Sequence, residues 1–184
     1  MSVERIKNNI LSLGKASVIS PLASGGRAKQ QTFVDDNEGV LVDIHPHEIE
    51  QHLKNGRTPP SFELAGPRKN IYFDPSKLRC ALVTCGGLCP GLNDIIRSSV
   101  LELYYHYGVP ALCGMRHGLQ GFIPQYGHEV LELKPSSVTN ILDMGGSILG
   151  SSRGPQDIEE IVDCLDRMNI GILFMVGGDG TLKA

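Results

Sequence analysis

One glycine-rich stretch constrains the fold of this chain more than any other part of its sequence. Residues 84–94 read TCGGLCPGLND, directly after the apolar run CALV and directly before a segment with helical periodicity. Three glycines and one proline so close together suit neither a helix nor a packed core. The stretch therefore predicts a tight turn between a buried strand and a helix, with a backbone that must come close to another group.

The region from residue 78 to the last residue alternates strand patterns with helix patterns. Helices are expected over 93–107, 135–144 and 156–168, and strands over 78–84, 109–113, 129–133 and 171–176. This alternation predicts an α/β fold with an open, mainly parallel sheet and helices on both faces. In the helix over 156–168, the apolar spacing predicts one buried face, and the continuous apolar run 171–176 predicts a strand buried on both sides.

Residues 1–77 are predicted to form an irregular N-terminal extension, and residues 78–184 a nucleotide-binding α/β domain that is incomplete. Within the extension we expect a short helix over 2–13, a strand or two over 32–44, and a short helix that residues 45–50 start and Asn55-Gly56 stops. The stretch from Arg57 to Lys77 is rich in proline and charge and is predicted to be an extended connector.

Charge and hydropathy exclude several classes of function. A formal net charge of −3 and a pI of about 6.0 give no basic surface for nucleic acid. No apolar run approaches the roughly 18 residues of a membrane-spanning helix, and the first residues do not resemble a secretory signal. Five cysteines without framework spacing suit a reducing compartment. We therefore expect a cytoplasmic protein that binds neither nucleic acid nor membrane.

Glycine-rich loops occupy three positions near the carboxyl ends of predicted strands, at residues 86–91, 145–154 and 177–180. Ligands of open α/β sheets bind at that edge. Glycine removes the Cβ atom and permits unusual backbone angles, so successive N–H groups can turn toward one anion. The three loops predict a phosphate site, although each loop taken alone is equally consistent with a tight turn that binds nothing.

Two charged residues within these loops narrow the kind of phosphate site. The patterns GxxxxGK[ST] and GxGxxG are both absent. Arg153 can clamp a phosphate through its forked donors. A carboxylate among phosphate-binding amides, as at Asp179, makes sense if it holds Mg²⁺, which binds through one or two carboxylates plus phosphates. The alternative for Asp179 is an ordinary turn or helix-cap residue.

Three sequence blocks, in order and spacing, resemble the N-terminal part of 6-phosphofructokinases: TCGGLCPGLNDIIR, GGSILGSSRGP and GGDGT. The residues of these blocks are most similar to those of the ATP-dependent branch found in plants, protists and spirochaetes. The resemblance implies a glycolytic kinase that transfers the γ-phosphoryl group of ATP, with Mg²⁺, to fructose 6-phosphate, giving fructose 1,6-bisphosphate. It also implies a homo-oligomer at full length.

The resemblance assigns site residues position by position. Asp179 serves the metal, and Gly180 favours ATP, because pyrophosphate-dependent relatives commonly have an aspartate whose bulk and charge crowd the ATP site. The residues implied to contact the nucleotide are Gly87, Arg153, Gly154, Gly178, Asp179, Gly180 and Thr181.

The resemblance leaves the catalytic base unassigned. The family's general-base aspartate is expected beyond Ala184, so no catalytic residue is predicted within this sequence. The chain is accordingly expected to be a donor-side fragment without measurable kinase activity alone. The alternatives are a pyrophosphate-dependent phosphofructokinase and a nucleotide-binding fragment without catalysis. A lipid or dinucleotide kinase is a further alternative, because those families also use a GGDGT block.

Overall fold

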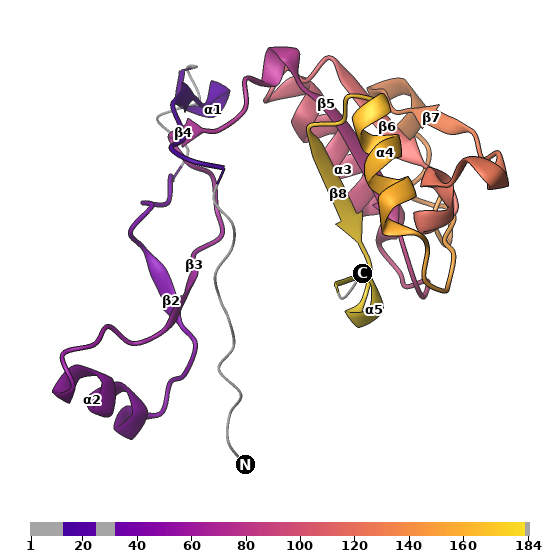
Figure 1. Ribbon diagram of the computed structural model, residues 1–184. Coiled ribbons are helices and arrows are strands. Elements are labelled where there is room, and N and C mark those ends of the chain that lie inside the picture. Colours follow the sequence, from indigo (N-terminus) through magenta and orange to yellow (C-terminus); the bar gives the residue numbers. More distant parts are fainter. Residues whose placement is uncertain (1–12, 25–31, 183–184) are drawn as a thin grey trace. The chain divides into compact units, whose positions relative to one another are not determined.

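A computed structural model describes residues 13–24 and 32–182 and divides the chain into two compact units, residues 1–73 and 74–184 (Figure 1). The helix predicted over 2–13 falls, apart from Leu13, on residues outside the described ranges. The division lies four residues before the boundary expected from sequence, after Phe73 rather than after Lys77.

The first unit consists of short elements. Strands β1 and β4 pair antiparallel, and so do β2 and β3, which means that the predicted connector over 57–77 contains two strands. The strand expected over 32–44 and the short helix expected to start at residues 45–50 are both confirmed. The elements are β1 Val18–Ile19, α1 Pro21–Ser24, β2 Gly39–Leu41, α2 Pro46–Lys54, β3 Ser61–Glu63 and β4 Asn70–Ile71.

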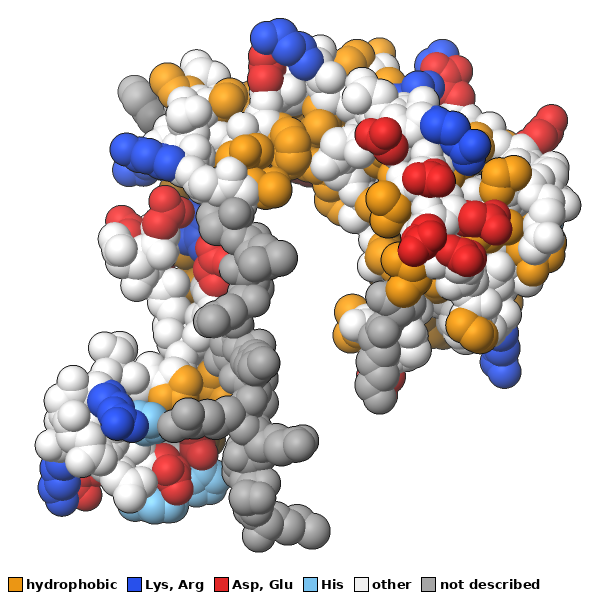
Figure 2. Space-filling view, in the orientation of Figure 1, with side chains coloured by type: hydrophobic (Ala, Val, Ile, Leu, Met, Phe, Trp, Pro, Cys, Tyr) orange, Lys and Arg blue, Asp and Glu red, His pale blue; other side chains and the backbone are white. Residues whose placement is uncertain are grey.

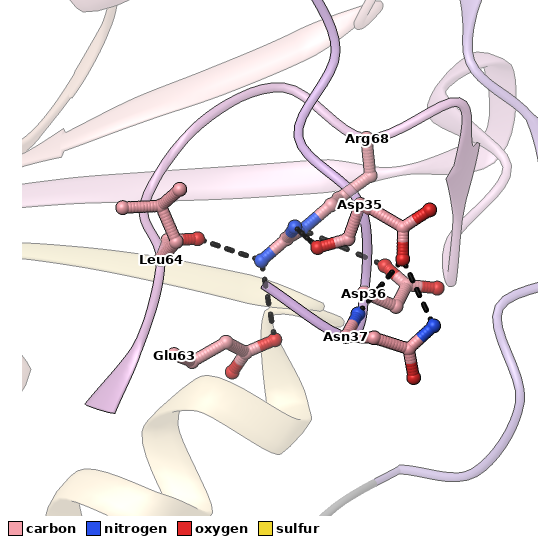
Figure 3. A network of polar contacts seen from close by, with 6 residues as sticks. All are labelled: Asp35, Asp36, Asn37, Glu63, Leu64 and Arg68. Atoms are coloured by element: carbon pink, nitrogen blue, oxygen red, sulfur yellow. Dashed lines mark hydrogen bonds and ion pairs between the residues drawn. The ribbon is translucent and has the colours of Figure 1, made fainter. Parts of the chain in front are cut away.

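Arg68 ties two segments of the first unit together (Figure 3). Its guanidinium donates hydrogen bonds of 2.6 Å to the carbonyl oxygens of Asp35 and Leu64, and it forms ion pairs with Asp36 at 3.6 Å and Glu63 at 3.5 Å. Only 17% of the Arg68 side chain is exposed. Among the described residues of this unit few apolar side chains are buried, so charged hydrogen bonds of this kind are a main contact between its segments.

The second unit contains a four-stranded sheet with the order β7-β6-β5-β8. Strand β5 pairs parallel with both β6 and β8, and β7 pairs antiparallel with β6, so the predicted α/β fold with a mainly parallel sheet is confirmed. The elements are the 3₁₀ helix η2 Pro75–Lys77, β5 Arg79–Thr84, α3 Leu92–Tyr105, β6 Ala111–Met115, η3 Gly118–Phe122, η4 Pro124–Tyr126, β7 Val130–Glu132, η5 Pro135–Val138, α4 Ile158–Arg167, β8 Ile172–Val176 and α5 Asp179–Leu182.

Helices cover both faces of this sheet (Figure 1). On one face Ala81 and Val83 of β5 belong to a buried apolar cluster, against which α4 packs Ile161 and Leu165. On the other face α3 lies beside β6, and its fully buried Ile96 contributes to the core there. Alternate side chains of β5 point to opposite faces, so this central strand, which is buried from Cys80 to Thr84, has a core on each side.

Three details of the second unit differ from the sequence expectations. The helix predicted over 135–144 is only the short turn η5, and β8 is partly exposed instead of buried on both sides, with Met175 38% exposed. On α4, Ile158 and Val162 are exposed, although their spacing predicted burial. The exposure of β8 and of α4 has one cause: β8 has one strand neighbour among the described residues, so that less of the sheet lies beneath α4 than expected. Figure 2 shows acidic side chains gathered over α4.

No helix within the described ranges is both long and apolar enough to cross a membrane.

Candidate functional site

The first and third glycine-rich loops lie side by side at the carboxyl edge of the sheet. Strand β5 ends at Thr84 and β8 ends at Val176, and the two strands are parallel neighbours whose last residues are in register. The backbone N–H of Cys85 donates a 2.8 Å hydrogen bond to the carbonyl of Val176, so the two loops start at the same level. The strand topology therefore places both loops at one edge.

The second loop, residues 145–154, has no strand of its own and is docked onto this edge by hydrogen bonds. The hydroxyl of Thr84 donates to the carbonyl of Gly150 at 2.6 Å. The backbone N–H of Gly86 donates to the carbonyl of Ser152 at 3.4 Å. These contacts bring the second loop beside the first, and all three loops therefore meet.

A cavity of about 770 Å³ lies where the three loops meet, within the usual size range of ligand pockets. Every residue that the sequence assigned to the nucleotide lines this cavity. Cys85, Gly86 and Ser152 line it as well. The sequence-assigned residues are Gly87, Arg153, Gly154, Gly178, Asp179, Gly180 and Thr181. Residues from separate parts of the chain thus surround one space.

One wall of this cavity is apolar and was not predicted as part of a site. It consists of side chains from η3, α4 and β8, and sequence patterns indicated those of α4 and β8 only as core. An apolar wall beside polar loops is typical of a pocket that binds a ligand with a flat organic part and a charged part. Its residues are Leu119, Ile158, Ile161, Leu173 and Met175.

The glycines of the site fall into two groups, according to what a Cβ atom at each position would contact. The two groups show which glycines the fold itself requires. A Cβ atom at Gly177 would lie 2.1 Å from the Thr181 hydroxyl oxygen, so the fold itself requires glycine there. At Gly87, Gly178 and Gly180 a Cβ atom would meet no described atom within 4 Å, and the backbone is outside the left-handed region. Packing explains the first glycine but not the other three, whose missing side chains leave the cavity open.

Asp179 opens α5 and is exposed at the cavity. Within the described ranges no group of three or more His, Cys, Asp or Glu side chains could hold a metal ion. Asp179 supplies one carboxylate at the cavity, which fits Mg²⁺, a cation that takes one or two carboxylates from a protein and its other ligands from phosphate oxygens and water.

Arg153 and Thr181 lie at the cavity in different ways. Arg153 is exposed and lines the cavity, and it also lines a second cavity of about 520 Å³ between the first and second loops. Thr181 is buried, and its backbone N–H already donates to the carbonyl of Gly178 at 2.9 Å. Arg153 is thus available to an anion, whereas the backbone N–H of Thr181 is engaged in holding the third loop.

An open α/β sheet with glycine loops around a cavity at its carboxyl edge has the arrangement in which this class of protein binds its ligands. Residues 79–184 match the family model described as phosphofructokinase, and the chain belongs to that family. This membership excludes the alternative that the chain belongs to a family of lipid or dinucleotide kinases. The resemblance stated from the sequence blocks is confirmed, since relatives named ATP-dependent 6-phosphofructokinase occur in a spirochaete, protists and a plant.

Individual relatives show how much of the family protein this chain represents. It is 41% identical to the ATP-dependent 6-phosphofructokinase of Amycolatopsis methanolica, over 94% of this chain and 38% of the relative. It is 42% identical to the protein of that name from Borreliella burgdorferi, over 97% of this chain and 41% of the relative. The chain therefore spans about two fifths of the length of these relatives.

A solved structure supports the fold. The crystal structure of Pichia pastoris phosphofructokinase in the T-state matches 67% of this chain and 12% of its own, with a TM-score of 0.51 and 24% identity.

Proposed function

We propose that this chain forms the donor-binding part of an ATP-dependent 6-phosphofructokinase. The observation that carries the proposal is the single cavity, surrounded by three loops, into which the glycines at 87, 178 and 180 place no side chain. The reaction would transfer the γ-phosphoryl group of ATP to the 1-hydroxyl of fructose 6-phosphate and give fructose 1,6-bisphosphate. We assign no general base to the described residues.

The residues of the cavity would act by positioning and by charge stabilisation, which is how phosphoryl-transfer enzymes work. The open backbone at Gly87 and Gly178 lets the phosphate chain approach the loops closely. Arg153 would hold phosphate oxygens through two parallel hydrogen bonds. Asp179 would anchor Mg²⁺, which neutralises the phosphate charge when bound.

Two features favour ATP over pyrophosphate as the donor. The apolar wall formed by Leu119, Ile158 and Leu173 gives a purine base a surface to pack against, whereas pyrophosphate has no such part. Gly180 adds no bulk and no charge at the loop, and a Cβ atom there would meet nothing within 4 Å. A pyrophosphate-dependent enzyme is the alternative, and competition between the two donors distinguishes them.

The proposed function is tested by titrating the chain with Mg·ATP in a calorimeter. We expect saturable binding that EDTA weakens, that Asp179→Asn weakens by about tenfold, and that pyrophosphate displaces poorly. Asp166→Asn, an exposed carboxylate on α4 that does not line the cavity, is the matched control and should bind as the wild type does. Equal loss in both variants, or absence of binding in the wild type, would contradict the proposal.

We also propose the physiological setting implied by the resemblance. The full-length protein would act in glycolysis in the cytoplasm as a homo-oligomer, with Mg²⁺ as its metal and no nucleic acid or membrane partner. If the full-length protein binds Mg·ATP but does not turn over fructose 6-phosphate, the nucleotide-binding alternative without catalysis would be favoured instead.

A further inference from the structure

We propose that Asn93 and Thr84 are positioning residues, which fix the second glycine-rich loop and thereby set Arg153 at the donor cavity. The inference rests on the proposed function for the identity of the ligand. Neither side chain lines the donor cavity, so each acts through the loop. The two residues flank the first loop, Thr84 at the end of β5 and Asn93 in the first turn of α3.

Asn93 bridges the start of the second loop with both ends of its side-chain amide. Its Nδ2 donates to the carbonyl of Met144 at 2.9 Å, and its Oδ1 accepts from the backbone N–H of Ile148 at 2.9 Å. These partners are 51 and 55 positions away in the sequence. The side chain is only 3% exposed, so losing either bond would leave a polar group with little access to water.

Thr84 fixes the middle of the same loop through a chain of hydroxyl groups. Its Oγ1 donates to the carbonyl of Gly150, and therefore accepts the 2.8 Å bond from the Ser147 hydroxyl, because a hydroxyl has one proton to give. The Ser147 oxygen in turn accepts from the backbone N–H of Leu149 at 3.2 Å. Thr84 is 1% exposed, so its own hydroxyl is shielded from water.

Asn93 and Thr84 act together with other contacts that hold this loop. The backbone N–H of His117 donates to the carbonyl of Leu149 at 2.7 Å, and the backbone of Gly86 donates to the Ser152 carbonyl and accepts from the Ser151 hydroxyl. From Gly145 to Gly154 the loop contains no helix and no strand, so its backbone groups need partners from elsewhere. The second cavity, of about 520 Å³, lies between residues 86–88 and 145–147 and leaves that part of the loop without close packing. The polar bonds of Asn93 and Thr84 therefore fix residues 144–150, and through them contribute to the position of Arg153 three residues further on.

The test combines a structural readout with a binding readout on the same chain. We expect Asn93→Leu to speed amide hydrogen exchange at Ile148 by about tenfold and to raise the Kd for Mg·ATP by about tenfold. Thr84→Val should raise that Kd to a similar extent. Thr84→Ser keeps the hydroxyl and should bind Mg·ATP as the wild type does. Val100→Ala is the matched control: it creates a cavity at a fully buried position of α3, and should lower the melting temperature without changing the Kd.

Each outcome decides the inference. Unchanged exchange at Ile148 in the Asn93 variant overturns it, and so does faster exchange with an unchanged Kd, or an equal rise in Kd for Val100→Ala. If Asn93→Leu does not fold, the pair Thr84→Val and Thr84→Ser gives the answer, and equal affinity of those two overturns the inference. If the wild type does not bind Mg·ATP, the proposed function has failed, while exchange at Ile148 still decides whether Asn93 fixes the loop.

Discussion

The hydroxyl of Thr84 donates a 2.6 Å hydrogen bond to the carbonyl oxygen of Gly150, which lies 66 positions later in the sequence. This bond joins the last residue of the central strand to a loop that belongs to no strand. It explains how Arg153 reaches the same cavity as Gly178 and Asp179, which follow β8 directly. The candidate site therefore depends on a contact between distant parts of the chain.

Two neighbouring glycines should respond in opposite ways to alanine. Gly178→Ala should leave the free energy of unfolding within about 0.5 kcal/mol of wild type, because its Cβ atom meets nothing, but should raise the Kd for Mg·ATP about tenfold. Gly177→Ala should lower the free energy of unfolding by about 1–3 kcal/mol, because its Cβ atom would lie 2.1 Å from the Thr181 hydroxyl oxygen. Denaturant unfolding and calorimetry measure the two effects. Equal stability of both variants, or unchanged affinity of the Gly178 variant, would contradict this reading.

Gly180→Asp should change the preference between donors. The added carboxylate would stand next to that of Asp179 and occupy space that is now open. We expect the ratio of ATP affinity to pyrophosphate affinity, both measured with Mg²⁺, to fall by about tenfold. Gly180→Ala adds bulk without charge and separates the two causes. A ratio that stays at the wild-type value would show that this position does not select the donor.

Stability should fall in mildly acidic solution because of His117. Desolvation lowers the pKa of His117 from its ordinary value of 6.5, and the nearby charges of His128 and Arg116 lower it further. The centre of the His128 ring lies 4.4 Å from that of His117, and the ring of Tyr126 stacks on His128. Just below pH 6.5 the unfolded chain therefore binds more protons than the folded chain. The contribution of neutral His117 to the free energy of unfolding is complete above pH 6.5 and is lost as the pH falls through the lowered pKa.

His117→Asn isolates that effect. Asparagine tolerates the left-handed backbone at this position, where φ is 60°, and does not titrate in this range. The free energy of unfolding, measured from pH 5 to pH 8, should depend less on pH in the variant than in the wild type. Parallel curves for the two proteins would exclude His117 as the source.

Among the described charged residues of the first unit, Arg68 should be the one whose substitution lowers stability most. Arg68→Gln removes the charged bonds to the carbonyl oxygens of Asp35 and Leu64, and should lower the stability of that unit by about 1–3 kcal/mol. Lys54→Gln is the control, since its ion pair with Glu50 is largely exposed and contributes little. Amide exchange in β2 and β3 reports the difference. Similar exchange in the two variants would mean that the network contributes no more than a surface ion pair.

The sequence predicted those parts of the structure that local patterns determine. Strand β5, helix α3 and the glycine loops follow from apolar periodicity and from turn residues, and the loop motifs named the residues that line the cavity. Exposure of Ile158 could not be predicted, because helical spacing shows which side chains share a face but not how far the sheet extends beneath them. The roles of Thr84 and Asn93 were missed for a similar reason, since their partners lie more than 50 positions away. The apolar wall was missed because its residues resemble ordinary core residues.

The most direct test of the central claim is a crystal structure of the chain with Mg²⁺ and a non-hydrolysable ATP analogue. We predict triphosphate density against the open backbone at Gly87, Gly178 and Gly180, with a metal beside the Asp179 carboxylate and the base along the apolar wall. Density for the triphosphate at any other place on the chain, with this cavity empty, would contradict the account.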